Sequence, residues 1–317
     1  MEGYHKPVLL REVIEALVVK ENRWYLDCTL GDGGHSLEIL RLGGNVLGID
    51  VDPQALERVK KRLQAAGLRL RGRSDSRSYS GQDFRLVQGN FRDLKSILQN
   101  QTETKGLKFK GCLFDLGVSS LQLERPERGF SFSREGPLDM RMDPALSVSA
   151  LDLIKGLNKG ELYELFAKLG QEKLAKSLAA ALVSARKVGN GEKGVGISST
   201  RQFTSLVEGV YRKHGIHRQR IHPATRVFLA LRMAVNDELN ALKEGLYQAV
   251  DLIEKNGHIV VISFHSLEDR IVKDTFRQWQ NDGLGETTIR KPITPAEEEV
   301  RINLRSRSAK MRVFRVN

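Results

Sequence analysis

The stretch DCTLGDGGHSLEIL, residues 27–40, connects a short apolar run to a helical pattern through a turn that contains three glycines. Glycine has no side chain, so the backbone of such a turn can approach a ligand closely. A strand followed by a glycine turn and a helix is typical of the first unit of an α/β domain. The turn is compatible with a dinucleotide phosphate, a nucleoside without a phosphate, or no ligand.

The same alternation of strand and helix continues on both sides of this turn. Apolar runs typical of buried strands cover residues 24–28, 45–49, 84–87, 112–116 and 258–263. Helical patterns separate the first four runs, which predicts a mostly parallel sheet with helices on both faces. Asp27, Asp50 and Asp115 lie at or near the ends of three runs. Ligands bind at the carboxyl ends of strands in such sheets, so these carboxylates are candidate site residues.

Charge and cysteine content limit the classes of protein that remain. The chain of 317 residues has 51 Lys and Arg against 39 Asp and Glu, a net charge of +12. This excess favours a polyanionic partner, either nucleic acid or an anionic membrane surface. No apolar run reaches the roughly 18 residues of a membrane span, and no signal peptide is evident, which predicts a cytoplasmic protein. Cys28 and Cys112 are the only cysteines, so we expect buried thiols and neither a disulfide framework nor a metal site.

The strand pattern stops after residue 122, and only helical patterns and loops follow as far as His222. An apolar stripe from Val227 to Ile253 then predicts one long helix before the last strand. We therefore expect a discontinuous α/β domain at 1–122 and 224–317, with an inserted all-helical substrate-recognition domain at 123–223. The polar segment 69–84 is expected to be a surface loop, and RNA contact is the alternative.

The glycine pattern distinguishes between cofactors. A dinucleotide fingerprint needs three spaced glycines; Gly31 and Gly33 fit the first two places, but Ser36 occupies the third. Asp50, at the end of the second strand, can accept both hydroxyls of a ribose. Phe91 follows the third strand and can flank an adenine. This combination favours S-adenosylmethionine, a nucleoside cofactor without a pyrophosphate, with an NAD-dependent enzyme as the alternative.

Longer blocks of the chain resemble one known family. The matching stretches are HKPVLLREV (5–13), DCTLGDGGHS (27–36), GIDVDP (48–53), DLGVSSLQLERPERGFSFSREGPLDMRMD (115–143), HPATRVFLALRMAVNDEL (222–239), ISFHSLEDRIVK (262–273) and RSAKMRV (307–313). Together they resemble the small-subunit ribosomal RNA N4-cytosine methyltransferase family (RsmH, also called MraW). The resemblance implies a Rossmann-like class I methyltransferase fold. It also implies S-adenosylmethionine-dependent methylation of a cytosine N4 in 16S rRNA, near the decoding site of the small ribosomal subunit.

The resemblance also implies a set of site residues. The cofactor-binding residues would be Gly33, Gly34, His35, Asp50, Phe91, Asp115 and Gln122. The exocyclic amine of cytosine is a poor nucleophile, so the enzyme must align it and accept a hydrogen bond from it. Asp115 and His265 are our catalytic candidates, and Asp269 is a further one. A competing interpretation of Ser266 to Asp269 is a capping box that begins a helix.

Basic and aromatic residues predict contacts to RNA in two segments. The first combines arginines and phenylalanines beyond the fourth strand, namely Arg125, Arg128, Phe130, Phe132, Arg134 and Arg141. The second is the tail, with Arg305, Arg307, Lys310 and Arg312. Arginine with aromatics suits phosphate contact and base stacking, whereas internal ion pairing is the structural alternative. His222 is either a helix cap or a binding residue.

Two further alternatives stay open at this point. A non-catalytic RNA-binding ribosome-assembly factor on the same fold would carry the same basic segments. The sequence does not determine the oligomeric state, with a dimer as one alternative. Because the basic clusters lie in distant segments, we expect the assembled subunit, rather than free rRNA, to be the substrate.

Overall fold

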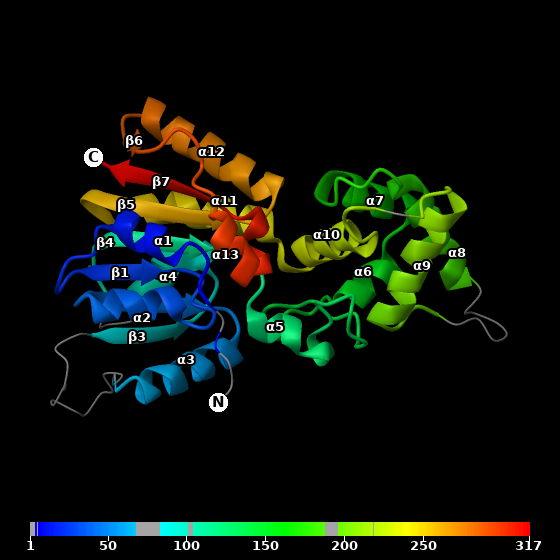
Figure 1. The fold of residues 1–317 in the computed structure, drawn as a ribbon, viewed down its shortest axis with the longest axis horizontal. Coiled ribbons are helices and arrows are strands. Elements are labelled where there is room, and N and C mark those ends of the chain that lie inside the picture. Colours follow the sequence, from blue (N-terminus) through cyan, green and yellow to red (C-terminus); the bar gives the residue numbers. More distant parts are fainter. Residues whose placement is uncertain (1–3, 5, 68–82, 101–103, 188–195, 218) are drawn as a thin grey trace. The chain divides into compact units, whose positions relative to one another are not determined.

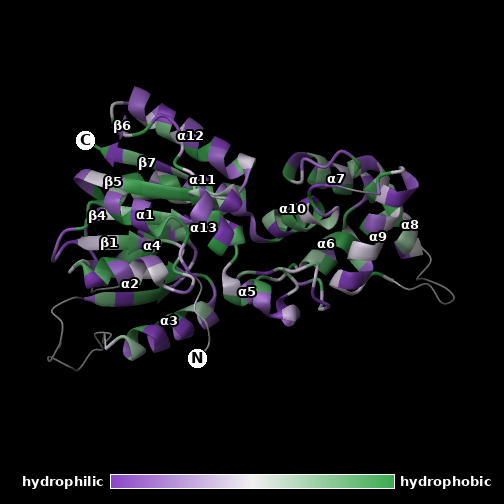
Figure 2. Cartoon of the chain, viewed as in Figure 1, coloured by the Kyte–Doolittle hydropathy of each residue, from purple (hydrophilic) through white to green (hydrophobic). Residues whose placement is uncertain are grey.

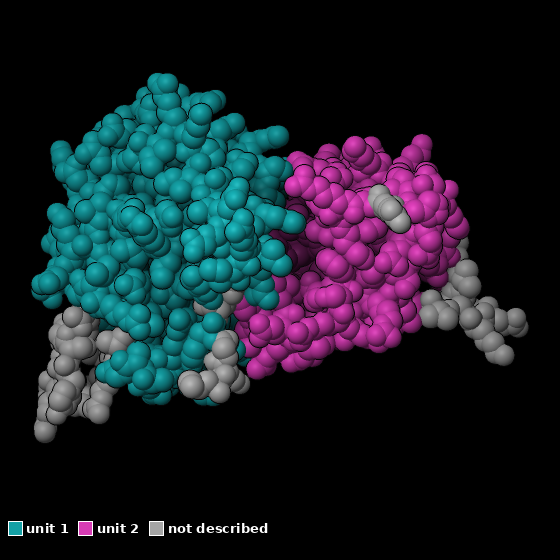
Figure 3. Space-filling model, viewed as in Figure 1, with its two compact units in different colours: residues 1–119, 239–317 teal, residues 120–238 magenta. Residues whose placement is uncertain are grey.

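A computed structural model of the chain describes residues 4, 6–67, 83–100, 104–187, 196–217 and 219–317. The chain divides into two compact units (Figure 3): unit 1 comprises residues 1–119 and 239–317, and unit 2 comprises residues 120–238. The sequence placed the domain boundaries at 122/123 and 223/224 instead. Most of the polar segment 69–84 lies outside the described residues.

Unit 1 contains a mixed sheet with the strand order β3-β2-β1-β4-β5-β7-β6 (Figure 1). Strands β1 to β5 pair in parallel, whereas β7 runs antiparallel to both β5 and β6. The bounds are β1 Trp24–Asp27, β2 Asn45–Asp50, β3 Phe84–Gln88, β4 Phe109–Asp115, β5 Ile253–Ser263, β6 Gly285–Thr287 and β7 Lys310–Val316. The mostly parallel sheet and the class I methyltransferase-like fold are confirmed. Strands β6 and β7 were not among the expected strands.

Helices cover both faces of the sheet, as expected. Side chains of α1 (Leu10–Leu17), α2 (Gly34–Arg41) and α3 (Pro53–Ala65) form one core with alternate residues of the strands. The other core contains side chains of α4 (Leu94–Gln99), α11 (Glu238–Val250) and α12 (Ser266–Asn281). Figure 2 shows the central strands as largely apolar, while α3 alternates polar and apolar residues. Burial on both faces explains why the strands are continuous apolar runs in the sequence.

The carboxyl ends of β1 to β5 meet at one edge of this sheet, because these strands are parallel. Asp27, Asp50 and Asp115 are the last residues of β1, β2 and β4. Helix α13 (Glu297–Ile302) and the 3₁₀ helix Leu304–Ser308 precede the last strand. Among the described residues, no helix combines the length and the apolar composition that crossing a membrane requires.

Unit 2 contains helices and loops, with no named strand in its described residues. Its helices are α5 Ser120–Glu124, α6 Ala150–Gly156, α7 Lys159–Glu164, α8 Ala175–Lys187, α9 Thr200–Lys213 and α10 Ala224–Asn236, with a π-helical turn at Leu165–Leu169.

The prediction of one long helix along the apolar stripe from Val227 to Ile253 is wrong. Helix α10 ends at Asn236, and Asp237 adopts a left-handed conformation with φ of 48°. The side-chain amide of Asn236 donates to the carbonyl oxygens of Met140 and Arg232 at this point. Helix α11 begins at Glu238, and Ile253 already belongs to β5. The apolar periodicity continues across the break because both helices bury a stripe, so the pattern alone does not reveal the break.

Candidate functional site

The glycine turn lies between β1 and α2, at the carboxyl edge of the sheet. Gly33 has a φ of +67°, and a Cβ atom there would lie 2.9 Å from Val59 Cγ1. A Cβ atom on Gly34 would lie 2.3 Å from Cγ of Pro7, which comes from the N-terminal segment. Both glycines are therefore required by packing, and Gly33 is also required by its backbone conformation.

The buried carboxylate of Asp27 stabilises this turn through two hydrogen bonds. Its carboxylate accepts a hydrogen bond from Ser36 Oγ at 2.6 Å and one from the Thr29 amide at 3.2 Å. Burial raises the pKa of Asp27, and the hydrogen bond from Ser36 offsets part of that increase. Ser36 occupies the place of the third glycine in a dinucleotide fingerprint, so its hydroxyl gives this departure a structural reason.

Asp50 lies beside the turn with its carboxylate fixed by two backbone amides. Gly31 N donates to Oδ2 at 2.8 Å, and Asp52 N donates to Oδ1 at 2.9 Å. Burial raises the pKa of Asp50 to about 6, against the opposing effect of these hydrogen bonds. A carboxylate oxygen has more than one acceptor site, so each oxygen can still accept a hydroxyl. The geometry therefore fits the two hydroxyls of a ribose.

Phe91 follows β3 in a short 3₁₀ turn, Phe91–Asp93, which the side chain of Asn90 caps by accepting from Arg92 N. Its ring is half-buried and meets Phe114 edge-on, with ring centroids 5.4 Å apart. Gly245 of α11 leaves room for it, since a Cβ there would lie 2.7 Å from the Phe91 ring. Because Gln88 pairs with Asp50, Phe91 belongs to the same edge of the sheet.

Asp115 and His35 meet at this edge. The Asp115 amide donates to Thr29 Oγ1 at 2.6 Å, which links the end of β4 to the turn after β1. His35 Nε2 lies 3.4 Å from Asp115 Oδ2. His35 is only 5% exposed, and neither ring nitrogen has a hydrogen-bond partner in the described part of the chain. The Asp115 side chain is 25% exposed, so it faces solvent on another side.

Gln122 is the one predicted cofactor residue outside unit 1. It is buried in α5 of unit 2. Its role in cofactor binding stays a prediction.

His265 is the N-cap of α12, and its ring contacts Glu268 in the first turn of that helix. Nδ1 accepts from Glu268 N at 3.4 Å, and Nε2 lies 3.1 Å from Glu268 Oε1. Glu268 Oε2 in turn accepts from the amide of Phe264 at 2.8 Å. The expected capping box at Ser266 to Asp269 is therefore shifted by one residue, because histidine itself provides the cap. Glu268 was not among the candidate site residues predicted from the sequence.

Asp269 binds the basic tail. Arg312 Nε donates to Oδ1 at 2.7 Å, and Lys310 Nζ donates to Oδ2 at 3.3 Å. Burial raises the pKa of Asp269, but the hydrogen bonds and charges of Arg312 and Lys310 outweigh it and hold the pKa below its usual value. Lys310 and Arg312 thus make internal ion pairs, which favours the structural alternative for the buried Arg312, whereas the Lys310 side chain stays 43% exposed. Arg305 and Arg307 are exposed.

Several residues of the arginine and phenylalanine segment 125–141, in unit 2, also make internal contacts. Arg128 donates to the carbonyl oxygens of Arg141 and Met142, and Arg141 pairs with Asp139 at 2.8 Å. Phe130 is buried. These residues therefore hold the loop in place. For them, internal contacts are favoured over the alternative of RNA contacts.

Phe132 and His222 form a stacked pair in the same unit. Their ring centroids are 4.6 Å apart with an interplanar angle of 12°. His222 Nδ1 also accepts from Ala224 N at 3.2 Å, so it contacts the start of α10, although Pro223 is the N-cap of that helix. Arg125 and Arg134 remain in exposed positions of the loop.

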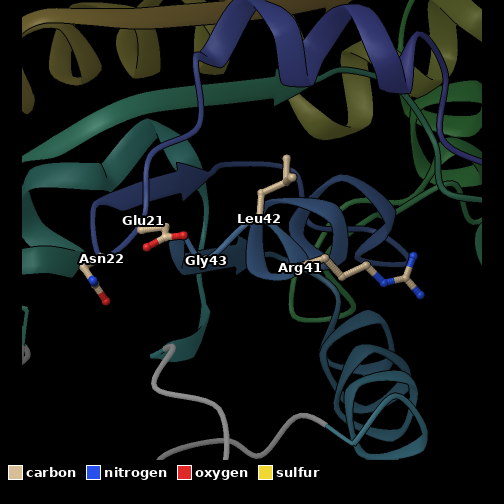
Figure 4. A pocket seen from close by; sticks show the side chains of 5 residues that line it. All are labelled: Glu21, Asn22, Arg41, Leu42 and Gly43. Carbon is tan, nitrogen blue, oxygen red and sulfur yellow. The ribbon is translucent and has the colours of Figure 1, made fainter.

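A separate hollow of about 420 Å³ lies between the end of α2 and the segments that precede β1 and β2 (Figure 4). Its lining consists of Glu21, Asn22, Arg41, Leu42 and Gly43. These residues belong to the amino-terminal edge of the sheet, opposite to the glycine turn. The hollow is therefore distinct from the candidate site.

The residues predicted from the sequence are those expected to face the cofactor, whereas the residues that hydrogen-bond within the turn and to Asp115 were not predicted as site residues. Asp27 was noted only as a strand-end residue, and Thr29 was not selected. The one available signal was Ser36, a hydroxyl residue at the place where a dinucleotide fingerprint has glycine.

Comparisons with known proteins identify the family of the chain. A sequence profile described as the MraW methylase family matches residues 2–317. A Persephonella marina protein named "Ribosomal RNA small subunit methyltransferase H" is 43% identical, covering 98% of this chain and 98% of that protein. Proteins of the same name from Halothermothrix orenii and Carboxydothermus hydrogenoformans are each 40% identical, covering 98% of this chain and 97% of theirs. With the fold, the glycine turn and these matches over nearly the whole length, the chain belongs to the MraW methylase family.

Proposed function

We propose that this chain transfers a methyl group from S-adenosylmethionine to N4 of a cytosine in 16S rRNA, near the decoding site of the small ribosomal subunit. The observation that carries the proposal is the convergence of the glycine turn, Asp50 and Asp115 at one edge of the sheet. The names of the full-length relatives support the small-subunit rRNA as the acceptor. Such a substrate implies a cytoplasmic enzyme.

The residues present fit this cofactor. Asp50 would bind the ribose, since both of its oxygens are oriented by backbone amides and keep acceptor capacity. Gly33 and Gly34 would admit the methionine part close to the backbone, and Phe91 would flank the adenine. We keep Gln122 in this set as predicted; for His35, the buried ring beside Asp115 favours a role on that carboxylate over a direct contact with the cofactor. The bound cofactor supplies a methyl group on a positively charged sulfur, which makes the carbon electrophilic.

Asp115 is the proposed hydrogen-bond acceptor for the amine. During transfer, the bond from N4 to the methyl carbon forms as the carbon–sulfur bond breaks, with the electron pair remaining on sulfur. One N4 proton passes to the Asp115 carboxylate, so the methylated amine ends neutral. Both ring nitrogens of His265 face Glu268, which supports a structural role for His265 in holding the start of α12.

Incubation of the enzyme with methyl-labelled S-adenosylmethionine and small subunits that lack the modification tests the proposal. We expect label on one cytosine N4 of 16S rRNA. Asp115→Asn should lower the rate constant of transfer by roughly 10²-fold or more, because an amide cannot take up the proton. Asp251→Asn, which changes an exposed carboxylate that pairs with Lys95, is the matched control and should retain wild-type activity.

The second candidate is a non-catalytic assembly factor, which the excess of positive charge also suits. Tight binding of small subunits by the folded protein, without any label in the RNA, would establish this alternative and refute the methyltransferase proposal. Transfer of label to free 16S rRNA at the rate seen with subunits would refute the preference for an assembled substrate.

A further inference from the structure

His35 has an environment that a cofactor-lining residue alone does not need. The ring is buried, at 5% exposure, and both nitrogens lack a hydrogen-bond partner in the described parts of the chain. Buried polar atoms without a partner are uncommon and usually mark a site that another group completes. The nearest acceptor is Asp115, whose Oδ2 lies 3.4 Å from His35 Nε2.

The other carboxylate near His35, that of Asp27, already accepts two hydrogen bonds within the turn. Asp27 lies close enough for the charge of His35 to lower its pKa, but burial raises that pKa more strongly. The two oxygens of Asp27 accept from Thr29 N and Ser36 Oγ. By contrast, His35 is the only described residue whose basic side chain lies within 4.0 Å of the Asp115 carboxylate. Asp115 is therefore the natural partner of this ring.

The backbone holds the two residues in register. Asp115 N donates to Thr29 Oγ1 at 2.6 Å, and Cys28 N donates to the carbonyl oxygen of Leu113 at 2.9 Å. These bonds fix the end of β4 against the turn that leads into α2, where His35 is the second helical residue. A distance of 3.4 Å is long for a hydrogen bond, and such bonds at catalytic sites often shorten only when the substrates bind.

We propose that His35 is a positioning residue that acts through Asp115: its Nε2–H donates to Oδ2 and thereby orients Oδ1 toward the amine of the cytosine. This inference rests on the proposed methyl transfer. A carboxylate on a partly exposed strand end has more than one side-chain rotamer, and a hydrogen bond from a buried ring selects one. A histidine that orients a carboxylate should affect the rate of transfer more than the binding of cofactor.

The test compares His35→Leu with His35→Gln, whose amide nitrogen can reach the place of Nε2. The readouts are the single-turnover rate constant at saturating S-adenosylmethionine and small subunits, and the Kd of S-adenosylhomocysteine from calorimetry. We expect His35→Leu to lower the rate constant roughly 10- to 100-fold, as for other orienting hydrogen bonds, with Kd changed by less than about threefold. His35→Gln should recover most of the rate.

A double variant and a control complete the design. His35→Leu added to Asp115→Asn should cause little further loss, because the two residues act as one unit. His258→Gln, in β5 and away from the carboxyl edge, should retain the wild-type rate constant. If His35→Leu does not fold, His35→Gln and His35→Asn replace it, and only the longer glutamine should preserve the rate.

Three outcomes would overturn the inference: a loss that lies mainly in the Kd, equal losses in the glutamine and shorter variants, or multiplicative losses in the double variant. These are distinguishable from failure of the proposed function. If the wild-type protein transfers no methyl group, the function itself is refuted. If the wild type transfers methyl and the folded His35→Leu variant does so equally fast, only the positioning role is refuted.

Discussion

Asp50 combines a functional position with an unfavourable environment. Burial raises its pKa to about 6 from the ordinary 3.8, so the folded chain binds a proton there more tightly than the unfolded chain does. Stability from this group is therefore present at low pH and is lost as the pH rises through about 6. At neutral pH the ionised carboxylate costs about 3 kcal/mol of folding free energy, from the shift of roughly two pKa units. The ionised carboxylate can accept hydrogen bonds from two hydroxyl groups at once.

This pKa predicts how cofactor affinity depends on pH. The affinity for S-adenosylhomocysteine should weaken as the pH falls from 8 to 5, with the change centred near 6, because protonation removes an acceptor from Asp50. Titration calorimetry across that range measures it. Asp50→Asn should bind weakly at every pH and should lack this transition. Equal wild-type affinity at pH 5 and pH 8 would contradict the role of Asp50 in the ribose contact.

At the scale of elements, the glycine turn depends on the N-terminal segment that precedes α1. Pro7 packs on Gly34, and the amide of Leu9 donates to Glu299 Oε1 at 2.8 Å. Asn303 also donates to the carbonyl oxygen of Lys6. Residues of α13 and of the segment that follows it thus hold the N-terminal segment that covers the turn.

Gly34→Ala tests this packing. The new Cβ would lie 2.3 Å from Cγ of Pro7, and a proline ring yields little, so the N-terminal segment must move. We expect a loss of about 1–3 kcal/mol in the free energy of unfolding, as for other overpacked sites, together with weaker cofactor binding. Denaturant unfolding and calorimetry measure the two effects.

Pro7→Ala in the same chain should restore part of both losses, because it removes the atom that clashes. Gly156→Ala is the matched control, since a Cβ atom there meets nothing within 4 Å. An unchanged stability and affinity in Gly34→Ala would show that the contact with Pro7 is not needed.

Several elements were visible in the sequence and others were not. The strands β1 to β4 and the helices between them follow from periodicity, because each is buried in a regular way. Strand β7 was missed since charged residues alternate with apolar ones in KMRVFRV, although Met311, Val313 and Phe314 are buried. The shift of the capping box to His265 escaped notice because histidine is an unusual N-cap.

At the scale of the whole molecule, we expect the net charge of +12 to affect binding to a polyanion more than any single arginine does. Part of the basic set is internal: Arg312 and Lys310 bind Asp269, and Arg128 and Arg141 order a loop. The exposed remainder, such as Arg307, is left for contacts with a polyanion.

The charge predicts a strong dependence on salt. Binding to small subunits should weaken by an order of magnitude or more between about 50 and 200 mM salt, because phosphate contacts release counterions. Cofactor affinity should change by less than about twofold. Arg307→Gln should reduce the slope of log Kd against log salt by about one if it contacts a phosphate, whereas Arg11→Gln, which pairs with Glu15, should leave it unchanged. Subunit binding that is insensitive to salt would contradict a phosphate-dominated interface.

The sequence by itself determined the α/β class, the glycine turn and the family, because these depend on residues that are close in the chain or on long matching blocks, whereas the ribose contact of Asp50 stays a prediction. Only the tertiary structure decided which polar groups support the site. Thr29 and Asp115 are 86 residues apart, and Asp269 and Arg312 are 43 apart. Such pairs form because the sheet places β1 beside β4, and β7 beside β5, which leads into α12 with Asp269. Strand order is set by packing of the whole unit rather than by local pattern.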